Sequence, residues 1–110
     1  MNILIINQNK NFQKEYEDFF SLYGIECFFA ADKQETISIL SHRLINKIIL
    51  FIDDIYDIGI LQFINTNYKK VKVILSTNKN FKDAFSIMHE SNFEMIDEPM
   101  ILNELKNKIL

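Results

Sequence analysis

Apolar residues in this chain come in two patterns that alternate from one end to the other. Short runs rich in apolar residues lie at residues 3–6, 25–30, 48–52, 71–75 and 93–96, and the unbroken run at 3–6 is typical of a strand buried on both faces of a sheet. Between these runs, apolar residues recur every three or four positions, as on one face of an amphipathic helix. The alternation predicts an α/β fold: a doubly wound, five-stranded parallel sheet with helices on both faces.

The helical stretches also carry signals for where a helix begins and ends. The first helix is predicted from aromatic side chains at helical spacing: Phe12, Tyr16, Phe19, Phe20 and Tyr23. Gly24 then stands where a left-handed helix cap favours a residue without Cβ. Asp32 and Glu35 have the spacing of a capping box, which predicts a second helix through Ile37, Leu40 and Leu44. Further helices are expected at residues 60–67, at 81–88 and from about residue 101 onwards.

Length, composition and charge place the chain among ordinary globular domains. Its 110 residues predict a single domain over residues 1–110, and a hydrophobic fraction of 48% with 25% charged residues argues against disorder. The net charge of −3 weighs against direct binding to nucleic acid, which needs a basic stripe. The lysines at positions 69, 70 and 72 are therefore expected to form a solvated turn.

Several features point to a cytoplasmic protein without a membrane partner. No apolar run reaches the ~18–20 residues that cross a bilayer, and the first residues lack the basic region of a signal peptide. The single cysteine, Cys27, lies in an apolar run and is expected to be a buried, inert thiol. His42 and His89 are expected on helix surfaces and indicate no metal site.

Candidate chemistry belongs where the predicted strands end, because open parallel sheets bind ligands beyond the carboxyl ends of their strands. The residues at those places are Asn7, Gln8, Phe51, Asp53, Asp54, Ser76, Thr77, Asp97, Glu98 and Pro99. The turn after the first run has no glycine, which weighs against a Gly-rich phosphate loop.

The order and spacing of these segments resemble a CheY-like response-regulator receiver domain over nearly the whole chain. Residues 3–8 are similar to the family's first strand and acidic pair, and residues 46–51 to the strand that ends in the phosphoacceptor aspartate. Gly59 matches the glycine that opens the third helix. Residues 73–76 and 93–100 resemble the fourth strand and the fifth strand with its Lys-Pro turn. The resemblance implies a flavodoxin-like (βα)5 fold with strand order 2-1-3-4-5.

The resemblance implies a phosphorylation mechanism, most of whose residues are replaced here. In the family, a histidine kinase phosphorylates the third-strand aspartate, the acidic pair holds Mg²⁺, and a Ser or Thr and a Lys contact the phosphoryl group. Asn7 and Gln8 replace the acidic pair. Phe51 replaces the phosphoacceptor and Glu98 the lysine, and only Ser76 keeps its type. Amides are weaker Mg²⁺ ligands than carboxylates, and phenylalanine has no nucleophile. We expect no catalytic residue, no cofactor, weak or no Mg²⁺ binding and no phosphorylation by the usual route.

Other functions stay open for the acidic residues after the third run. If the match to the family is shifted by two residues, Asp53 stands at the end of the third strand and becomes a phosphoacceptor. This shift loses the match to Gly59. Asp53, Asp54 and Asp57 could instead hold a divalent ion, although their spacing matches no known metal loop. A small-ligand site at the same end of the sheet is a further alternative, since doubly wound folds have many functions.

The resemblance therefore favours a signalling module that acts by protein–protein contact, and not an enzyme. The expected partner is a second copy or an output domain, bound to the face of the fourth helix, fifth strand and last helix. Met95 and Met100 flank that face, and methionine suits adaptable contacts. A role for a histidine kinase stays open. The chain is short for a receiver and could be the front part of a longer regulator.

Overall fold

The computed structural model describes residues 1–77, 93–97 and 102–110, and its centre is a parallel sheet. The strands are β1 (Asn2–Ile6), β2 (Glu26–Ala30), β3 (Lys47–Ile52), β4 (Lys72–Thr77) and β5 (Phe93–Asp97). Their order across the sheet is β2-β1-β3-β4-β5, and every neighbouring pair runs parallel. The predicted α/β class, parallel sheet and strand order are confirmed.

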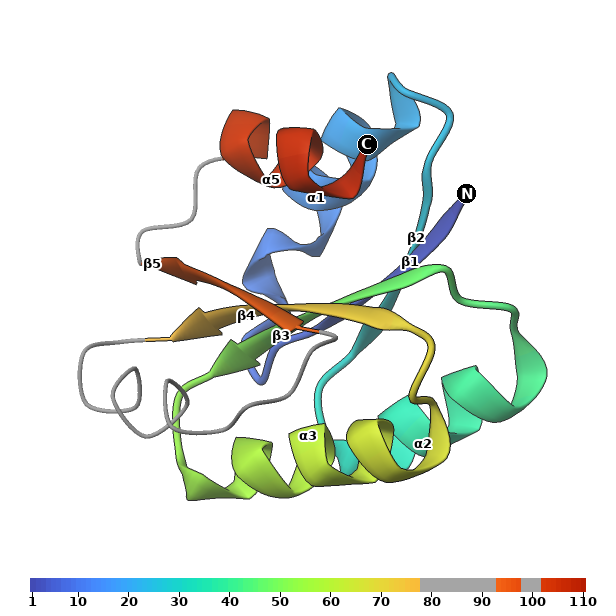
Figure 1. Ribbon diagram of the computed structural model, residues 1–110. Coiled ribbons are helices and arrows are strands. Elements are labelled where there is room, and N and C mark those ends of the chain that lie inside the picture. Colours follow the sequence, from blue (N-terminus) through green and yellow to red (C-terminus); the bar gives the residue numbers. More distant parts are fainter. Residues whose placement is uncertain (78–92, 98–101) are drawn as a thin grey trace.

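Helices cover both faces of the sheet. The helical elements are η1 (Lys10–Phe12), α1 (Gln13–Ser21), α2 (Lys33–His42), α3 (Ile55–Asn67) and α5 (Leu102–Ile109). Helices α1 and α5 lie on one face, and α2 and α3 on the other (Figure 1). The helix expected at residues 81–88 falls outside the described residues. No helix in the described part of the chain is both long and apolar enough to cross a bilayer.

The sheet is buried on both faces, as the apolar runs predict. Alternate residues of β3 enter different core clusters: Ile48 and Leu50 pack with α2 and α3, whereas Ile49 packs with α1 and α5. All three side chains are buried. Because side chains alternate along a strand, this alternation also sets which way the residues at the end of β3 point.

Two predicted helix boundaries are confirmed by their capping contacts. Gly24 has φ of +70°, the left-handed conformation that glycine adopts without strain. The Asp32 carboxylate accepts a hydrogen bond from the Glu35 backbone N–H at 2.8 Å, as an N-cap residue does.

The predicted start of the third helix is wrong. We expected a helix over residues 60–67 opened by Gly59, but α3 begins at Ile55, so Gly59 lies inside the helix. The cause is a capping box in which the side chains of Asp54 and Asp57 accept hydrogen bonds from the backbone at the helix start. This spacing matches that of Asp32 and Glu35 and was visible in the sequence.

Three apolar residues assigned to helix faces are instead exposed. Helix α2 ends at His42, and Arg43 has extended backbone angles, so Leu44 lies beyond the helix and is 80% exposed. Phe12 ends the short element η1, and Tyr23 follows α1, so neither belongs to the α-helix between them. Helical spacing alone places residues on a common face only while the helix continues.

Candidate functional site

Three of the predicted site residues lie side by side where β1, β3 and β4 end. Ile6 pairs with Leu50, so Asn7 follows β1 at the level of Phe51. Phe51 pairs with Ser76 in the parallel register of β3 and β4. The fold therefore brings Asn7, Phe51 and Ser76 together at the carboxyl edge of the sheet, where such folds bind ligands.

Phe51 makes this part of the edge apolar. Its side chain points to the α1 side of the sheet, as that of Ile49 does, and is partly buried against the core there. Its ring lies 6.3 Å from the ring of Tyr16, centroid to centroid, in a tilted arrangement typical of aromatic pairs. The ring of Phe51 is thus part of the core and offers no group that could accept a phosphoryl.

Ser76 lies beside this ring with a buried hydroxyl group. The residue is fully buried, and its Oγ forms no hydrogen bond with any residue that the structure describes. An unpaired buried hydroxyl costs roughly 1–3 kcal/mol of stability. Among the described residues, the Ser76 hydroxyl is therefore an unsatisfied polar group next to an apolar neighbour.

On the other side of the sheet, Gln8 connects the end of β1 to the start of α3. Its Nε2 lies 2.9 Å from Oδ2 of Asp54 and 3.3 Å from Oδ1 of Asp57. Ionised carboxylate oxygens only accept hydrogen bonds, so the amide must present its NH₂ group to them. We call Gln8, Asp54 and Asp57 the clamp.

Asp57 is the buried centre of the clamp. It is only 2% exposed, and its Oδ2 accepts hydrogen bonds from the backbone N–H groups of Asp53 at 2.8 Å and Asp54 at 3.1 Å. Hydrogen bonds to a charged acceptor are stronger than those between neutral groups. Sequence reasoning treated Asp57 only as a possible metal ligand and missed this structural role.

The residues at this edge do not fit the Mg²⁺ ion that the receiver fold implies. Mg²⁺ binds oxygen ligands, mainly carboxylates, but the Asp54 and Asp57 carboxylates face an NH₂ group that itself carries partial positive charge. Within the described residues, no group of three acidic, His or Cys side chains is arranged to hold a metal ion. The Gln8 amide thus already engages the two carboxylates that a cation would use.

Asp53 lies just after β3 with an exposed side chain. Partial burial raises the pKa of its carboxyl group above the usual value, and the nearby charges of Asp57 and Asp54 raise it further. The backbone of Asp53 is fixed by its hydrogen bond to Asp57. The strand ends one residue earlier, at Ile52, so Asp53 is outside the strand to which the two-residue shift would assign it.

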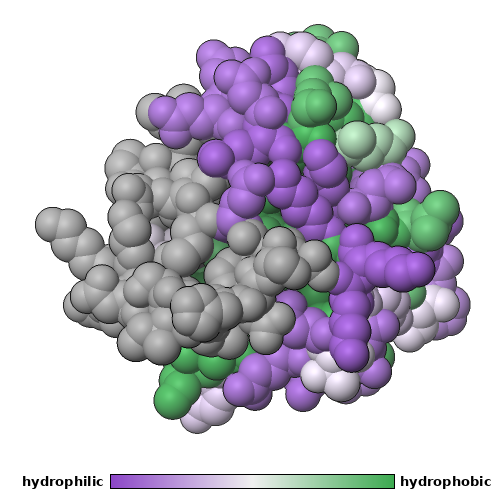
Figure 2. All heavy atoms as spheres, viewed as in Figure 1, coloured by the Kyte–Doolittle hydropathy of each residue, from purple (hydrophilic) through white to green (hydrophobic). Residues whose placement is uncertain are grey.

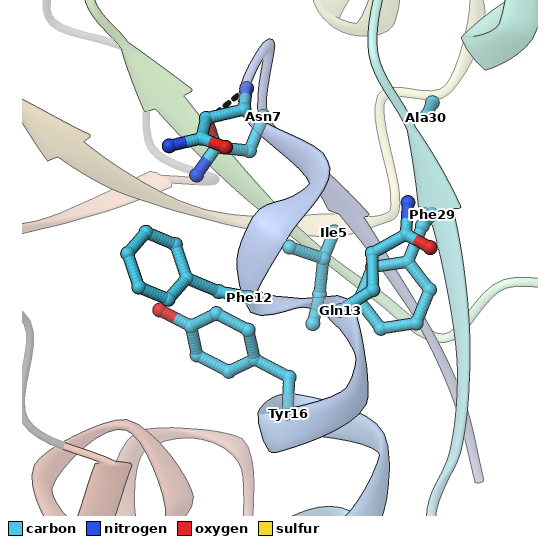
Figure 3. Close-up of a pocket in the computed structure, with 8 residues that line it drawn as sticks. Ile5, Asn7, Phe12, Gln13, Tyr16, Phe29 and Ala30 are labelled. Carbon is cyan, nitrogen blue, oxygen red and sulfur yellow. Dashed lines mark hydrogen bonds between the residues drawn. The ribbon is translucent and has the colours of Figure 1, made fainter.

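A small cavity lies beside Asn7, between β1, β2 and the start of α1. Figure 3 shows the rings of Phe12 and Tyr16 on one side of Ile5 and the ring of Phe29 on the other. The Oδ1 of Asn7 accepts a hydrogen bond from the Asn9 backbone N–H at 2.9 Å. The cavity measures about 10 Å³, room for one water molecule at most. It is much too small for a nucleotide or a flavin.

Cys27 lies on the edge strand β2 and is partly buried. Burial raises the pKa of its thiol to about 12, with a further contribution from the charge of Glu17. A thiol with so high a pKa is almost fully protonated at neutral pH and is a poor nucleophile. This agrees with the inert role expected from the sequence.

The remaining predicted site residues cannot be placed. Glu98, Pro99 and Met100 fall outside the described residues. Met95 lies in β5, paired with Leu75 of β4, but the position of its side chain is outside the description as well. The contact face expected from β5 and its neighbouring helices therefore stays a prediction.

The sequence matches no protein-family model and no curated protein. Solved structures resemble it closely in fold. A CheY-like receiver domain protein from Methanospirillum hungatei JF-1 shares 20% identity at a TM-score of 0.82, covering 98% of this chain and 89% of that one. A receiver protein from Pseudomonas putida shares 15% identity at a TM-score of 0.84, covering 98% and 93%.

A longer protein also contains this fold. NtrX from Brucella abortus shares 17% identity at a TM-score of 0.80, and the match covers 98% of this chain but only 25% of NtrX. At such low identities the comparisons establish the fold, which is the flavodoxin-like fold of response-regulator receiver domains.

Proposed function

We propose that this chain is an atypical receiver domain: a signalling module that acts by protein–protein contact and is not phosphorylated in the usual way. The fold of its structural neighbours supports the first part. The second part depends mainly on the clamp. Gln8 stands at a position where the family has a carboxylate that holds Mg²⁺, and here its amide donates to Asp54 and Asp57 instead.

The other residue changes at the carboxyl edge also argue against phosphorylation. Phosphoryl transfer needs a nucleophile and cationic groups that stabilise the transferred phosphoryl. Phe51 supplies no nucleophile and packs against Tyr16, and Glu98 would place a negative charge where the family has a lysine. The partner that we propose is an output domain or a second copy of the chain, without a cofactor or a nucleic acid.

A second candidate function is phosphorylation of Asp53 in a rearranged pocket. It is favoured by the exposed position of this carboxylate directly after β3, near the end of β1. Against it stands the clamp, because Mg²⁺ would have to displace the Gln8 amide before it could assist the transfer.

Intact mass after incubation with acetyl phosphate and Mg²⁺ separates these functions. We expect the wild-type chain to gain no phosphoryl group, since Phe51 offers no nucleophile and the carboxylates of Asp54 and Asp57 are engaged by the Gln8 amide. The control is Asp53→Asn under the same conditions. A stoichiometric phosphoryl gain in the wild type that is absent from Asp53→Asn would replace our proposal with the second candidate.

A further inference from the structure

The surfaces at the two ends of β3 carry charges of opposite sign. At the amino ends of β3 and β4, Lys47 and Lys72 are neighbours in the strand register. The exposed Lys69 and Lys70 lie in the turn before β4, and Lys108 of α5 shares the partner Glu94 with Lys72. We call these residues the basic edge: Lys47, Lys69, Lys70, Lys72 and Lys108.

The basic edge has an excess of positive charge in the described structure. Lys72 and Lys108 share one acidic partner, Glu94, at 2.7 and 3.3 Å. The hydrogen bond from Lys72, followed by smaller contributions from Lys108, lowers the pKa of the Glu94 carboxyl group. Lys47 donates to a backbone carbonyl of Ile109, which leaves its charge unneutralised.

The opposite end of β3 presents an acidic and apolar surface. Asp53, Asp54, Ile55 and Tyr56 follow one another there, and we call them the acidic turn. Ile55 is 70% exposed and Tyr56 is 80% exposed. In Figure 2, hydrophobic colour reaches the surface at the lower left, over the start of α3. The clamp fixes the backbone of Asp53 and Asp54, so the exposed carboxylate of Asp53 has a defined place on this surface, while the Asp54 carboxylate also takes part in the clamp.

The two surfaces hardly neutralise each other within one molecule. Strand β3, which separates them, has six residues and is therefore about 20 Å long. At physiological salt, charges further apart than about 8 Å are largely screened from one another. Each surface is thus available to a partner of the opposite charge.

We propose that the domain associates head to tail, with the acidic turn of one copy against the basic edge of the next. Charge complementarity indicates that the partner is a second copy, because the same chain carries both the acidic turn and the basic edge. The contact is heterologous, so it builds open chains or rings and not a closed symmetric pair. The inference deepens the proposed function and depends on it only for the biological role of the contact.

Sedimentation velocity of the wild-type domain at increasing concentration tests this contact. Exposed ion pairs are individually weak, so we expect association to need concentrations of up to about 1 mM. Raising the salt from about 0.01 M to about 1 M shortens the screening length from about 30 Å to about 3 Å and should abolish the association. A wild type that stays monomeric at low salt, or that associates equally at high salt, would overturn the proposal.

Charge reversal identifies the surfaces. Asp53→Lys and Lys69→Glu/Lys70→Glu should each lose the association, and an equimolar mixture should regain it because the swapped charges again attract. Lys14→Glu/Lys33→Glu makes the same charge change at exposed positions elsewhere and should still associate. Loss of association in that control, or no recovery in the mixture, would contradict the head-to-tail contact. A phosphoryl gain would overturn the proposed function without affecting these results.

Discussion

Replacing Gln8 by glutamate should destabilise the domain and make its stability depend on divalent cations. The change removes hydrogen bonds to two carboxylates and adds a third negative charge beside Asp54 and Asp57. We expect a loss of about 2–3 kcal/mol in the free energy of unfolding, after allowing for the exposure of Gln8 to solvent. Millimolar Mg²⁺ should restore most of it, because the variant then has three carboxylates for the ion.

Urea unfolding with and without Mg²⁺ measures this effect, and Gln62→Glu is the matched control. Gln62 is an exposed residue of α3, the helix that contains Asp57, and it takes no part in the clamp. The control should unfold like the wild type, with or without Mg²⁺. If Gln8→Glu is as stable as the control, the clamp does not hold the end of β1 to α3.

Removing the Asp57 carboxylate should cost about 3 kcal/mol of unfolding free energy. In Asp57→Ala, the backbone N–H groups of Asp53 and Asp54 lose their charged acceptor, and the NH₂ group of Gln8 loses one of its carboxylates. The side chain is almost fully buried, so water cannot easily take its place.

Asp32→Ala provides the comparison for Asp57→Ala in the same unfolding experiment. Asp32 is an ordinary exposed N-cap with one backbone hydrogen bond from Glu35, and its removal should cost about 1 kcal/mol. Equal losses in the two variants would mean that Asp57 is only a helix cap and that the other clamp contacts contribute little.

The sheet could be predicted from the sequence because its signals are local. Each apolar run corresponds to a strand, since strands buried on both faces of a sheet are rich in apolar residues. The capping roles of Gly24 and Asp32 could also be predicted, because each residue type meets a backbone requirement at its own position.

The third helix was misplaced because the apolar pattern of Leu61 and Ile64 marks a helix face but not the residue at which the helix begins. The match to Gly59 agreed with a start near that glycine, whereas Asp54 and Asp57 start the helix at Ile55. The interior of a helix tolerates a glycine at a cost of roughly 1 kcal/mol, so Gly59 does not mark a boundary.

The clamp could be predicted only in part. The sequence shows that Gln8 is neutral where the family is acidic, but not that its amide turns toward Asp54 and Asp57. That contact joins residues more than forty positions apart and needs the ends of β1 and β3 to be brought together. Likewise, nothing local in the sequence indicates that the hydroxyl of Ser76 would be buried beside Phe51 with no hydrogen-bond partner among the described residues.

Titration of the wild-type domain with Mn²⁺, followed by amide signals in NMR, tests the central claim most directly. The ion broadens the signals of amides close to where it binds, and the clamp should leave it no site at the carboxyl edge. We predict that the amides of Asn7, Asp53 and Thr77 keep their line widths, while those of Gln8→Glu broaden. Selective, saturable broadening of these amides in the wild type would contradict the account.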